Sequence, residues 1–365
     1  MTTGGGEGGV GAKLHVVKLR GHLPRYDKSL RLRDIEPFLD AAPYGESWDD
    51  YVKPGLQYFL GDASAVACRD LGVASVHPMG LYIRGIYGGE RKKGKEEYAG
   101  LALVEYGRRG ARFEFKLHNT EEALVVPLDS LERHHVGVYR VVYEGEINPF
   151  RLRRYVHVLL SRRGEQSLKE FLREALTLNS RSVSQETLSK VERLIEELKQ
   201  PSRVQPLNTA RYYVAFRCDR IFTAFAFKPE EDTVVESHVA YAECLSEDIA
   251  YYYAAVLNYL AYKLVKLGRA FGRHQYARPL LVACAAGLAW GSLDDEARRR
   301  VVECSKLLHS KSPRKEYRSQ RDALAEVARL PEFREVERLL DSRVDEKRLE
   351  EALSMVSRRS SREEE

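Results

Sequence analysis

Hydrophobic and polar residues along the first half of the chain alternate in the manner of β-strands. Runs rich in β-branched and aromatic residues predict strands at 13–20, 79–87, 98–106 and 112–117, and 124–128 and 138–143 continue this β-rich segment. Residues 73–77 lead into the strand at 79–87, and an apolar run at 155–160 lies between clustered arginines. The GRRG segment at 107–110 is expected to join two of these strands as a hairpin, and 88–95 is expected to form a second turn. The first half is therefore expected to be rich in strands.

The centre and the C-terminal region show helical spacing instead. Amphipathic helices are predicted at 167–178 and 185–199, with Ser184 as the cap of the second. Aromatic strands at 209–216 and 221–227 follow them, and 293–356 is helical throughout, with a break at Pro331. These patterns predict a mixed α/β fold, in which a strand-rich region precedes a helical C-terminal layer. The expected regions are 13–290, with divisions near 78 and 205, and 291–356, between disordered ends at 1–12 and 357–365.

The stretch from 232 to 290 organises the rest of the chain. It opens as a strand, and Ser246 then begins a helix whose apolar face runs from Ile249 to Leu267. Gly268 is expected to end that helix. A basic and aromatic loop follows at 269–278, and the apolar run after Pro279 is expected to be a second strand. The loop is either an ordinary connection or a contact for phosphate groups.

Composition limits the class of protein. With 365 residues, 44% hydrophobic and 31% charged, the chain fits a folded protein with more than one core. No apolar run reaches the roughly 18 residues of a membrane span, and the first residues lack a signal-peptide core, so we expect a cytoplasmic protein without membrane contact. Five scattered cysteines without CxxC spacing predict no metal site, and no cofactor is expected. Arginine outnumbers lysine, a bias reported for some heat-adapted proteins.

The net charge of +5 is compatible with nucleic-acid binding, and the basic residues are clustered. Arginine binds both phosphate groups and guanine edges in a bidentate manner. Three basic segments interspersed with tyrosines therefore supply the candidate DNA contacts. The expected contacts to the DNA backbone are Arg84, Arg91, Lys92 and Lys93; the expected contacts to backbone or bases are Arg151, Arg153, Arg154, Arg269, Arg273, His274 and Arg278.

Motifs of known catalytic sites are scarce. The chain has no GxGxxG after a strand, no GxxxxGK[ST], no HExxH and no GxSxG, and 148–150 (NPF) lacks the second proline of the amino-methyltransferase motif. One alternative is a Mg²⁺-dependent nuclease. Glu105 on one strand and Glu114 with Lys116 on the next have the residue types that hold a metal and orient water or phosphate. A second alternative is a non-catalytic scaffold whose helical tail docks a partner protein.

The order of segments from 79 to 356 resembles the target-recognition and C-terminal helical portion of Type IIG restriction enzymes and N6-adenine DNA methyltransferases. The similar segments are a turn like "GxxTG" at 84–89, a leucine-proline segment at 121–131, a strand at 154–160, a helix at 168–178, an aromatic strand RYYVAFR at 211–217, the AAVLNY helix at 247–258 and a "D…V" pattern at 340–345. This chain departs from the family in three ways. The methyltransferase domain is missing, Tyr259 replaces the serine after Leu257 and Asn258, and the turn lacks its threonine.

The resemblance implies a recognition (specificity) subunit that binds double-stranded DNA and has no catalysis of its own. It also implies a partner, namely a separately encoded methyltransferase, nuclease or helicase subunit. The family's recognition domains differ in the residues that read bases, so the resemblance assigns no base contacts.

Overall fold

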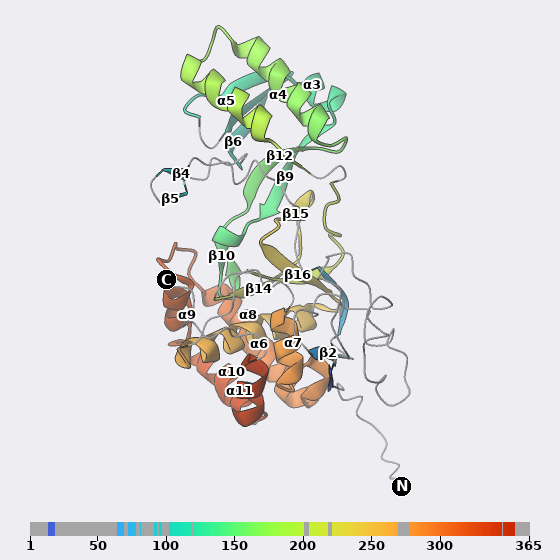
Figure 1. Cartoon of the computed structure of the whole chain (residues 1–365), viewed down its shortest axis with the longest axis vertical. Coiled ribbons are helices and arrows are strands. Elements are labelled where there is room, and N and C mark those ends of the chain that lie inside the picture. Colours follow the sequence, from blue (N-terminus) through green and yellow to red (C-terminus); the bar gives the residue numbers. More distant parts are fainter. Residues whose placement is uncertain are drawn as a thin grey trace.

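The computed structural model describes residues 14–18, 64–68, 72–77, 81, 91–92, 95–96, 102–117, 120–200, 204–217, 221–268, 278–344 and 346–354. Two lobes lie along the long axis of the molecule and are joined by strands (Figure 1). The upper lobe holds a sheet covered by helices, and the lower lobe holds a second sheet and the helical C-terminal region. The mixed α/β class and the helical C-terminal layer expected from the sequence are confirmed.

The upper lobe is built on a six-stranded sheet. Its strands run in the order β15-β9-β12-β6-β7-β8, and all neighbours are antiparallel except β15 and β9. The elements are β6 (Ala102–Arg109), β7 (Arg112–Leu117), β8 (Leu124–Pro127), α3 (Leu128–Arg133), β9 (Val136–Val142), β12 (Val156–Ser161), α4 (Glu165–Asn179), α5 (Gln185–Glu197) and β15 (Thr233–Val235). In β7, Phe113, Phe115 and Leu117 alternate with polar residues and face the buried core beneath α4.

The lower lobe contains a four-stranded antiparallel sheet in the order β14-β13-β16-β3. Its strands are β3 (Val73–His77), β13 (Tyr212–Arg217), β14 (Ala224–Phe227) and β16 (Val239–Cys244). The helices that follow are α6 (Glu247–Lys266), α7 (Arg278–Ala285), α8 (Asp295–Lys311), α9 (Gln320–Val327), α10 (Pro331–Asp341) and α11 (Glu346–Ser354). Three further pairs of short strands are β1 (Leu14–Lys18) with β2 (Ser64–Cys68), β4 (Arg91–Lys92) with β5 (Lys95–Glu96), and β10 (Ile147–Asn148) with β11 (Arg151–Leu152).

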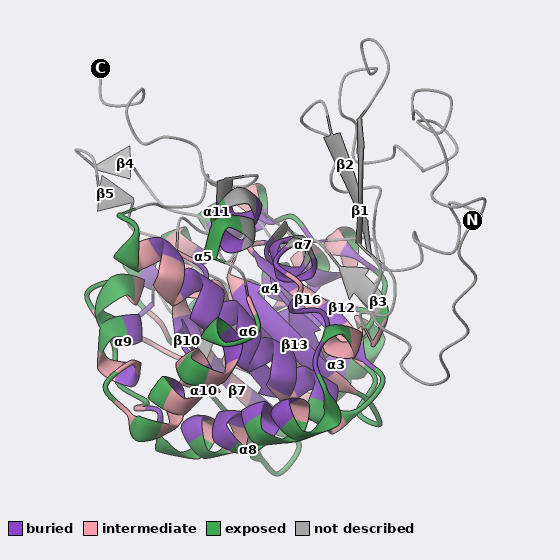
Figure 2. Cartoon of the chain, turned by 90° about the horizontal axis from the view of Figure 1, so that it is seen from below, coloured by how far each residue is buried: buried purple, intermediate pink, exposed green. Residues whose placement is uncertain are grey.

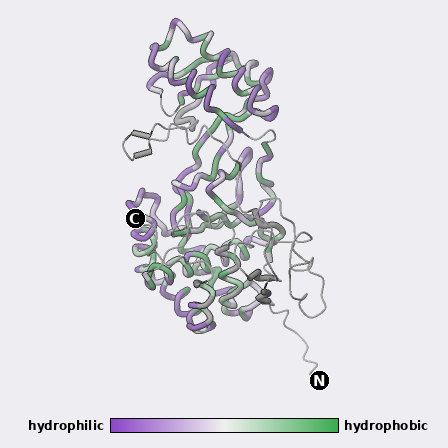
Figure 3. Tube along the Cα trace, in the orientation of Figure 1, coloured by the Kyte–Doolittle hydropathy of each residue, from purple (hydrophilic) through white to green (hydrophobic). Residues whose placement is uncertain are grey.

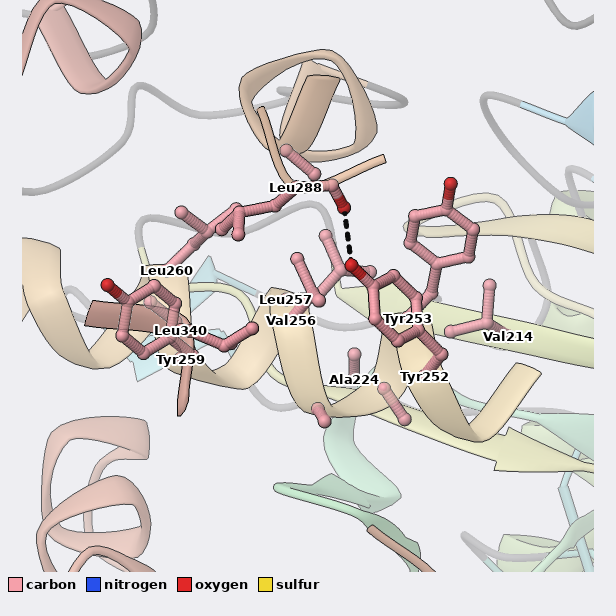
Figure 4. Packing of buried hydrophobic residues seen from close by; sticks show 14 of the residues in the cluster. Val214, Ala224, Tyr252, Tyr253, Val256, Leu257, Tyr259, Leu260, Leu288 and Leu340 are labelled. Carbon is pink, nitrogen blue, oxygen red and sulfur yellow. Dashed lines mark hydrogen bonds between the residues drawn. The ribbon is translucent and has the colours of Figure 1, made fainter. Parts of the chain in front are cut away.

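Helix α6 is buried on nearly all sides, whereas the sequence predicted a single apolar face. Seen from below, α6 lies in the buried centre while α8 and α10 expose their outer faces (Figure 2). Tyr252, Tyr253 and Tyr259 are among the largest fully buried side chains, and the Tyr252 hydroxyl donates to the Leu288 carbonyl over 3.0 Å (Figure 4). A helix that is apolar all round is surrounded by other elements. Here these are the sheet on one side and the other C-terminal helices on the remaining sides.

The two faces of the four-stranded sheet pack against different partners. Alternate residues such as Val214 and Ala224 contact α6, whereas Tyr213 and Phe225 point the other way, into a small core shared with β9 and β10. The hydropathy trace shows hydrophobic positions continuing through these linking strands (Figure 3). The chain also passes directly from β15 in the upper sheet to β16 in the lower sheet. The lobes are therefore joined by a packed junction.

Most local predictions are confirmed, and two are wrong. Residues 293–356 were predicted to be helical throughout, but 312–319 link α8 to α9 without forming a helix. Strands β6 and β7 form the expected hairpin, Ser184 and Ser246 accept hydrogen bonds from the backbone at the starts of α5 and α6, and Gly268 follows α6 with φ +63°. The apolar run after residue 278 was predicted to be a strand, but it begins as helix α7. A short apolar run has no period that distinguishes a strand from a buried helix, so packing against α6 decides.

One asparagine in each lobe joins a helix to the backbone of an edge strand. Asn258 of α6 accepts from the Ala224 amide over 3.1 Å and donates to the Ala224 carbonyl over 2.8 Å. Asn179 of α4 makes the same pair of bonds to Val125, over 3.1 and 2.9 Å. Strands β14 and β8 are the outer strands of their sheets, so these side chains satisfy backbone groups that lack a neighbouring strand. Asn258, part of the AAVLNY segment, thus has a structural role.

Candidate nucleic-acid interface

The hairpin of β10 and β11 is held firmly against the end of α8. Its turn contains Phe150 at φ +65°, a conformation that is strained for a residue with a side chain, and Phe150 is fully buried. The Phe150 amide donates to the Ala224 carbonyl over 2.7 Å. The side-chain amide of Asn148 donates to the backbone carbonyls of Pro313 and Lys315 over 3.3 and 3.0 Å. The hairpin therefore has one fixed position between the sheet and the segment that links α8 to α9.

Three arginines predicted to contact DNA leave this hairpin in different environments. Arg151 donates to the carbonyls of Ser310 and Ser312 at the end of α8, over 3.1 and 3.3 Å. Arg153 is mostly buried and forms an ion pair with Glu146 at 3.0 Å. Arg154 also approaches Glu146, at 3.3 Å, but its side chain is 77% exposed. Arg153 is thus committed to the fold, and Arg154 remains accessible to a ligand.

A cavity of about 410 Å³ opens beside the hairpin, where several separate segments meet. Its cationic lining comes from β11 and the residues after it, from the residue after β14, and from the link between α8 and α9. The cationic residues are Arg151, Arg153, Arg154, Lys228 and Arg314. Among the lining residues that the structure describes, Glu230 is the one carboxylate, and Arg140 pairs with it at 3.0 Å. The cavity therefore carries a net positive charge.

Two of these cations have no carboxylate partner within the described ranges. Arg314 is exposed, and no ion pair or hydrogen bond of its side chain is found there. Lys228 is exposed as well and lies over the ring of Tyr212, with 5.7 Å between Nζ and the ring centroid. Mutual repulsion among such groups is seen at Arg151, where burial lowers the pKa of the guanidinium and the charge of Arg314 lowers it further. An anion in the cavity would relieve this repulsion.

Aromatic rings form most of the uncharged part of the lining. Phe225 and Phe227 lie buried behind the cavity, with ring centroids 4.9 Å apart, whereas Tyr155 and Tyr251 are partly exposed. Burial and, to a lesser extent, the nearby Glu230 carboxylate raise the pKa of Tyr155 to about 12. The hydroxyl of Tyr155 therefore stays protonated at neutral pH and can donate a hydrogen bond.

His309 completes the aromatic wall and has a fixed tautomer. Its Nδ1 lies 2.8 Å from the Phe150 carbonyl oxygen, which only accepts, so Nδ1 carries the proton. Burial lowers the pKa of His309; the bond to Phe150 works against this, and the charges of Arg151 and Arg314 lower the pKa further. The imidazole is therefore neutral at neutral pH, and its Nε2 is an acceptor.

The other candidate DNA contacts cannot be compared with this cavity. Arg84, Lys93, Arg269, Arg273 and His274 lie outside the described residues. Of the remaining three, only backbone positions are described: Arg91 and Lys92 form β4, and Arg278 begins α7. One of the three predicted basic segments thus lines the cavity, and the DNA contacts predicted for the other two stay predictions.

The nuclease alternative gains little from the geometry. Glu105 lies opposite Lys116 and Glu114 lies opposite Gly107, so the two glutamates and the lysine belong to one face of the β6–β7 hairpin. The Glu114 carboxylate, however, is 3.6 Å from Arg109, a cation that competes with a metal ion. Within the part of the chain that the structure describes, no group of three or more His, Cys, Asp or Glu side chains could hold a metal.

Sequence reasoning missed three residues of the cavity: Lys228, His309 and Arg314. A signal was present, because 309–321 (HSKSPRKEYRSQR) is a basic segment that contains a proline, inside the region predicted to be helical throughout. In the sequence analysis its charged residues belong to the polar side of the predicted C-terminal helices. Its proximity to the β10–β11 hairpin depends on hydrogen bonds between residues more than 150 positions apart, such as Asn148 with Pro313.

Comparison with protein-family models, with curated proteins and with solved structures finds no match to this chain. In the described part of the chain, none of the helices is both long enough and apolar enough to cross a bilayer.

Proposed function

We propose that this chain binds DNA through the cationic cavity, as the recognition subunit of a system whose catalysis resides in another chain. The observation that carries the proposal is the convergence of cations from three separate segments around one cavity. Arg154, Lys228 and Arg314 are all exposed there, and Glu230, the one carboxylate of the described lining, is already paired with Arg140. Such groups are the usual partners of phosphate oxygens.

The assignment to DNA rests on two supports. Phosphate contacts by arginine and lysine release condensed counterions, which favours a highly charged polymer over a small anion. The order of segments also resembles the recognition portion of DNA-modifying enzymes, in which a catalytic domain acts on the bound DNA. A methyltransferase, nuclease or helicase subunit would supply the chemistry for which this sequence carries no motif.

The test is a titration of fluorescently labelled duplex DNA of mixed sequence with the full chain at several salt concentrations. For the natural sequence we expect the logarithm of affinity to fall linearly with the logarithm of salt concentration, by about 0.9 for each phosphate contacted. Reversing two exposed charges, Arg154→Glu with Arg314→Glu, should lower the affinity at least about ten-fold and reduce the slope by about 2.

A matched control keeps the same change in net charge but moves it away from the cavity. Arg181→Glu with Arg299→Glu alters two exposed arginines, one after α4 and one on α8 about 15 Å along the helix from His309. This variant should retain the slope and most of the affinity. If both double variants lose affinity equally, net charge alone drives binding and the cavity is not the site. Salt-independent binding, or none at low salt, would reject the proposal.

A further inference from the structure

The cavity is a recess with an aromatic wall, which restricts what part of a DNA molecule can enter it. Its volume of about 410 Å³ lies within the range of small-ligand sites. A base-paired duplex can place only its phosphates in such a recess. Its bases are stacked inside the double helix, and they are contacted by protein elements that enter the grooves, not by entering a cavity of the protein. Given the proposed DNA binding, we propose that the cavity holds one unpaired nucleotide, with its base on the aromatic wall and its phosphate among the arginines.

The aromatic wall presents rings that a base can contact. Tyr155, Tyr251 and His309 are partly exposed, and they lie at the lining together with the buried Phe225 and Phe227. The rings of Tyr251 and His309 are perpendicular, with centroids 5.6 Å apart, so the edge of one ring meets the face of the other. Every base has a π-face, and stacking on aromatic side chains is the common mode of binding single strands.

The backbone of Tyr251 and the ring of His309 are held by hydrogen bonds, which reduces the ordering that binding would require. Ser305 donates to the Tyr251 carbonyl over 2.6 Å, and Lys306 lies 5.5 Å from the centre of the Tyr251 ring. His309 is fixed by its bond to Phe150, whose strained backbone is held by the Ala224 carbonyl. Side chains that are already ordered lose little conformational entropy when a flat ligand binds to them.

Polar groups at the wall suit the edge of a base. The neutral His309 offers Nε2 as an acceptor, because Nδ1 is used by Phe150. The hydroxyl of Tyr155 is protonated and can donate. The exposed Arg154 and Arg314 belong to the same lining and would bind the phosphate. One nucleotide thus finds a stacking surface, an acceptor, a donor and a cationic end within one recess.

The experiment compares three labelled DNA probes of one sequence at fixed salt: a single strand, a blunt duplex, and a duplex with a single-stranded overhang. Phosphate contacts alone favour the duplex, because its charge density is higher. We expect the single strand and the overhang to bind about five-fold or more tighter than the blunt duplex, the contribution of one stacked base. Tyr155→Leu with Tyr251→Leu should remove this preference, so that the three probes bind with about the same affinity.

Three controls separate stacking from folding and from charge. Tyr251→Phe keeps the ring and should keep the preference, whereas Tyr251→Leu should reduce it. Tyr106→Leu removes a half-exposed ring from the β6–β7 hairpin of the other lobe and should change nothing. Arg154→Glu should weaken all three probes alike. These outcomes together support an unpaired nucleotide in the cavity.

Equal affinity for the three probes, with the salt dependence intact, would overturn the unpaired nucleotide and leave the proposed DNA binding standing. Loss of salt-dependent binding to every probe would instead reject the DNA binding on which this inference rests. An RNA strand of the same sequence that binds tighter than the DNA strand would overturn DNA as the ligand.

Discussion

Replacing Asn258 by alanine should destabilise the lower lobe much more than an ordinary polar substitution. The side chain is fully buried, and its amide makes three hydrogen bonds: from the Ala224 amide over 3.1 Å, to the Ala224 carbonyl over 2.8 Å, and to the Ala254 carbonyl over 2.8 Å. Truncation leaves the Ala224 N–H buried on an edge strand without a partner. The Ala224 carbonyl keeps its bond from the Phe150 amide, so one group is orphaned rather than two.

The expected magnitude follows from these contacts. An unsatisfied buried N–H costs about 1–3 kcal/mol, and losing the second bond to the carbonyl adds about 1 kcal/mol. The free energy of unfolding should therefore fall by about 2–4 kcal/mol. Asn179→Ala removes the equivalent bonds in the upper lobe, but Val125 is only half-buried, so water can replace part of the loss. A decrease of about 1–2 kcal/mol is expected there.

Urea unfolding followed by circular dichroism measures these differences. The control is Asn208→Ala, because Asn208 is exposed and its side chain accepts one local bond from the Ala210 amide over 2.9 Å. That variant should lose about 1 kcal/mol or less. If Asn258→Ala costs no more than Asn208→Ala, the bonds to the edge strand contribute little net stability and the reasoning is refuted.

Two further changes test other parts of the fold. Burial raises the pKa of Glu337, but bonds to Lys266 and Lys263 outweigh burial, so its pKa lies below the ordinary 4.5. Its stabilising contribution should be complete above pH 4.5 and should be lost as the pH falls below that value; Glu337→Gln should flatten this part of the stability-versus-pH curve. His135 is exposed at φ +49°, so His135→Gly should raise stability by up to about 1 kcal/mol in urea unfolding, and an unchanged or lower midpoint would contradict the strain argument.

The candidate site shows why basic residues alone are weak evidence for a binding surface. Arg151, Arg153 and Arg154 look alike in the sequence, yet the first binds backbone carbonyls and the second is buried against Glu146. Only Arg154 is largely free for a ligand. Glu146 lies only seven residues before Arg153, but its burial results from the packing of the junction, which no local pattern reports.

The sequence by itself determined the elements whose causes are local. Alternation predicted the β6–β7 hairpin, helical spacing predicted α4, α5, α6 and the C-terminal helices, and the hydroxyls of Ser184 and Ser246 marked two helix starts. These features depend on neighbours within a few residues. Side chains alternate every two residues in a strand and recur every three or four in a helix, and a capping bond spans two or three residues.

Only the tertiary structure decided which distant segments meet. It made a helix of the apolar run after residue 278, surrounded α6 on nearly all sides, and turned Asn258 toward an edge strand. It also brought Lys228 and Arg314 to the arginines of the β10–β11 hairpin. Such meetings depend on how the apolar faces of whole elements pack, and the spacing of residues along the chain carries no information about which faces pair.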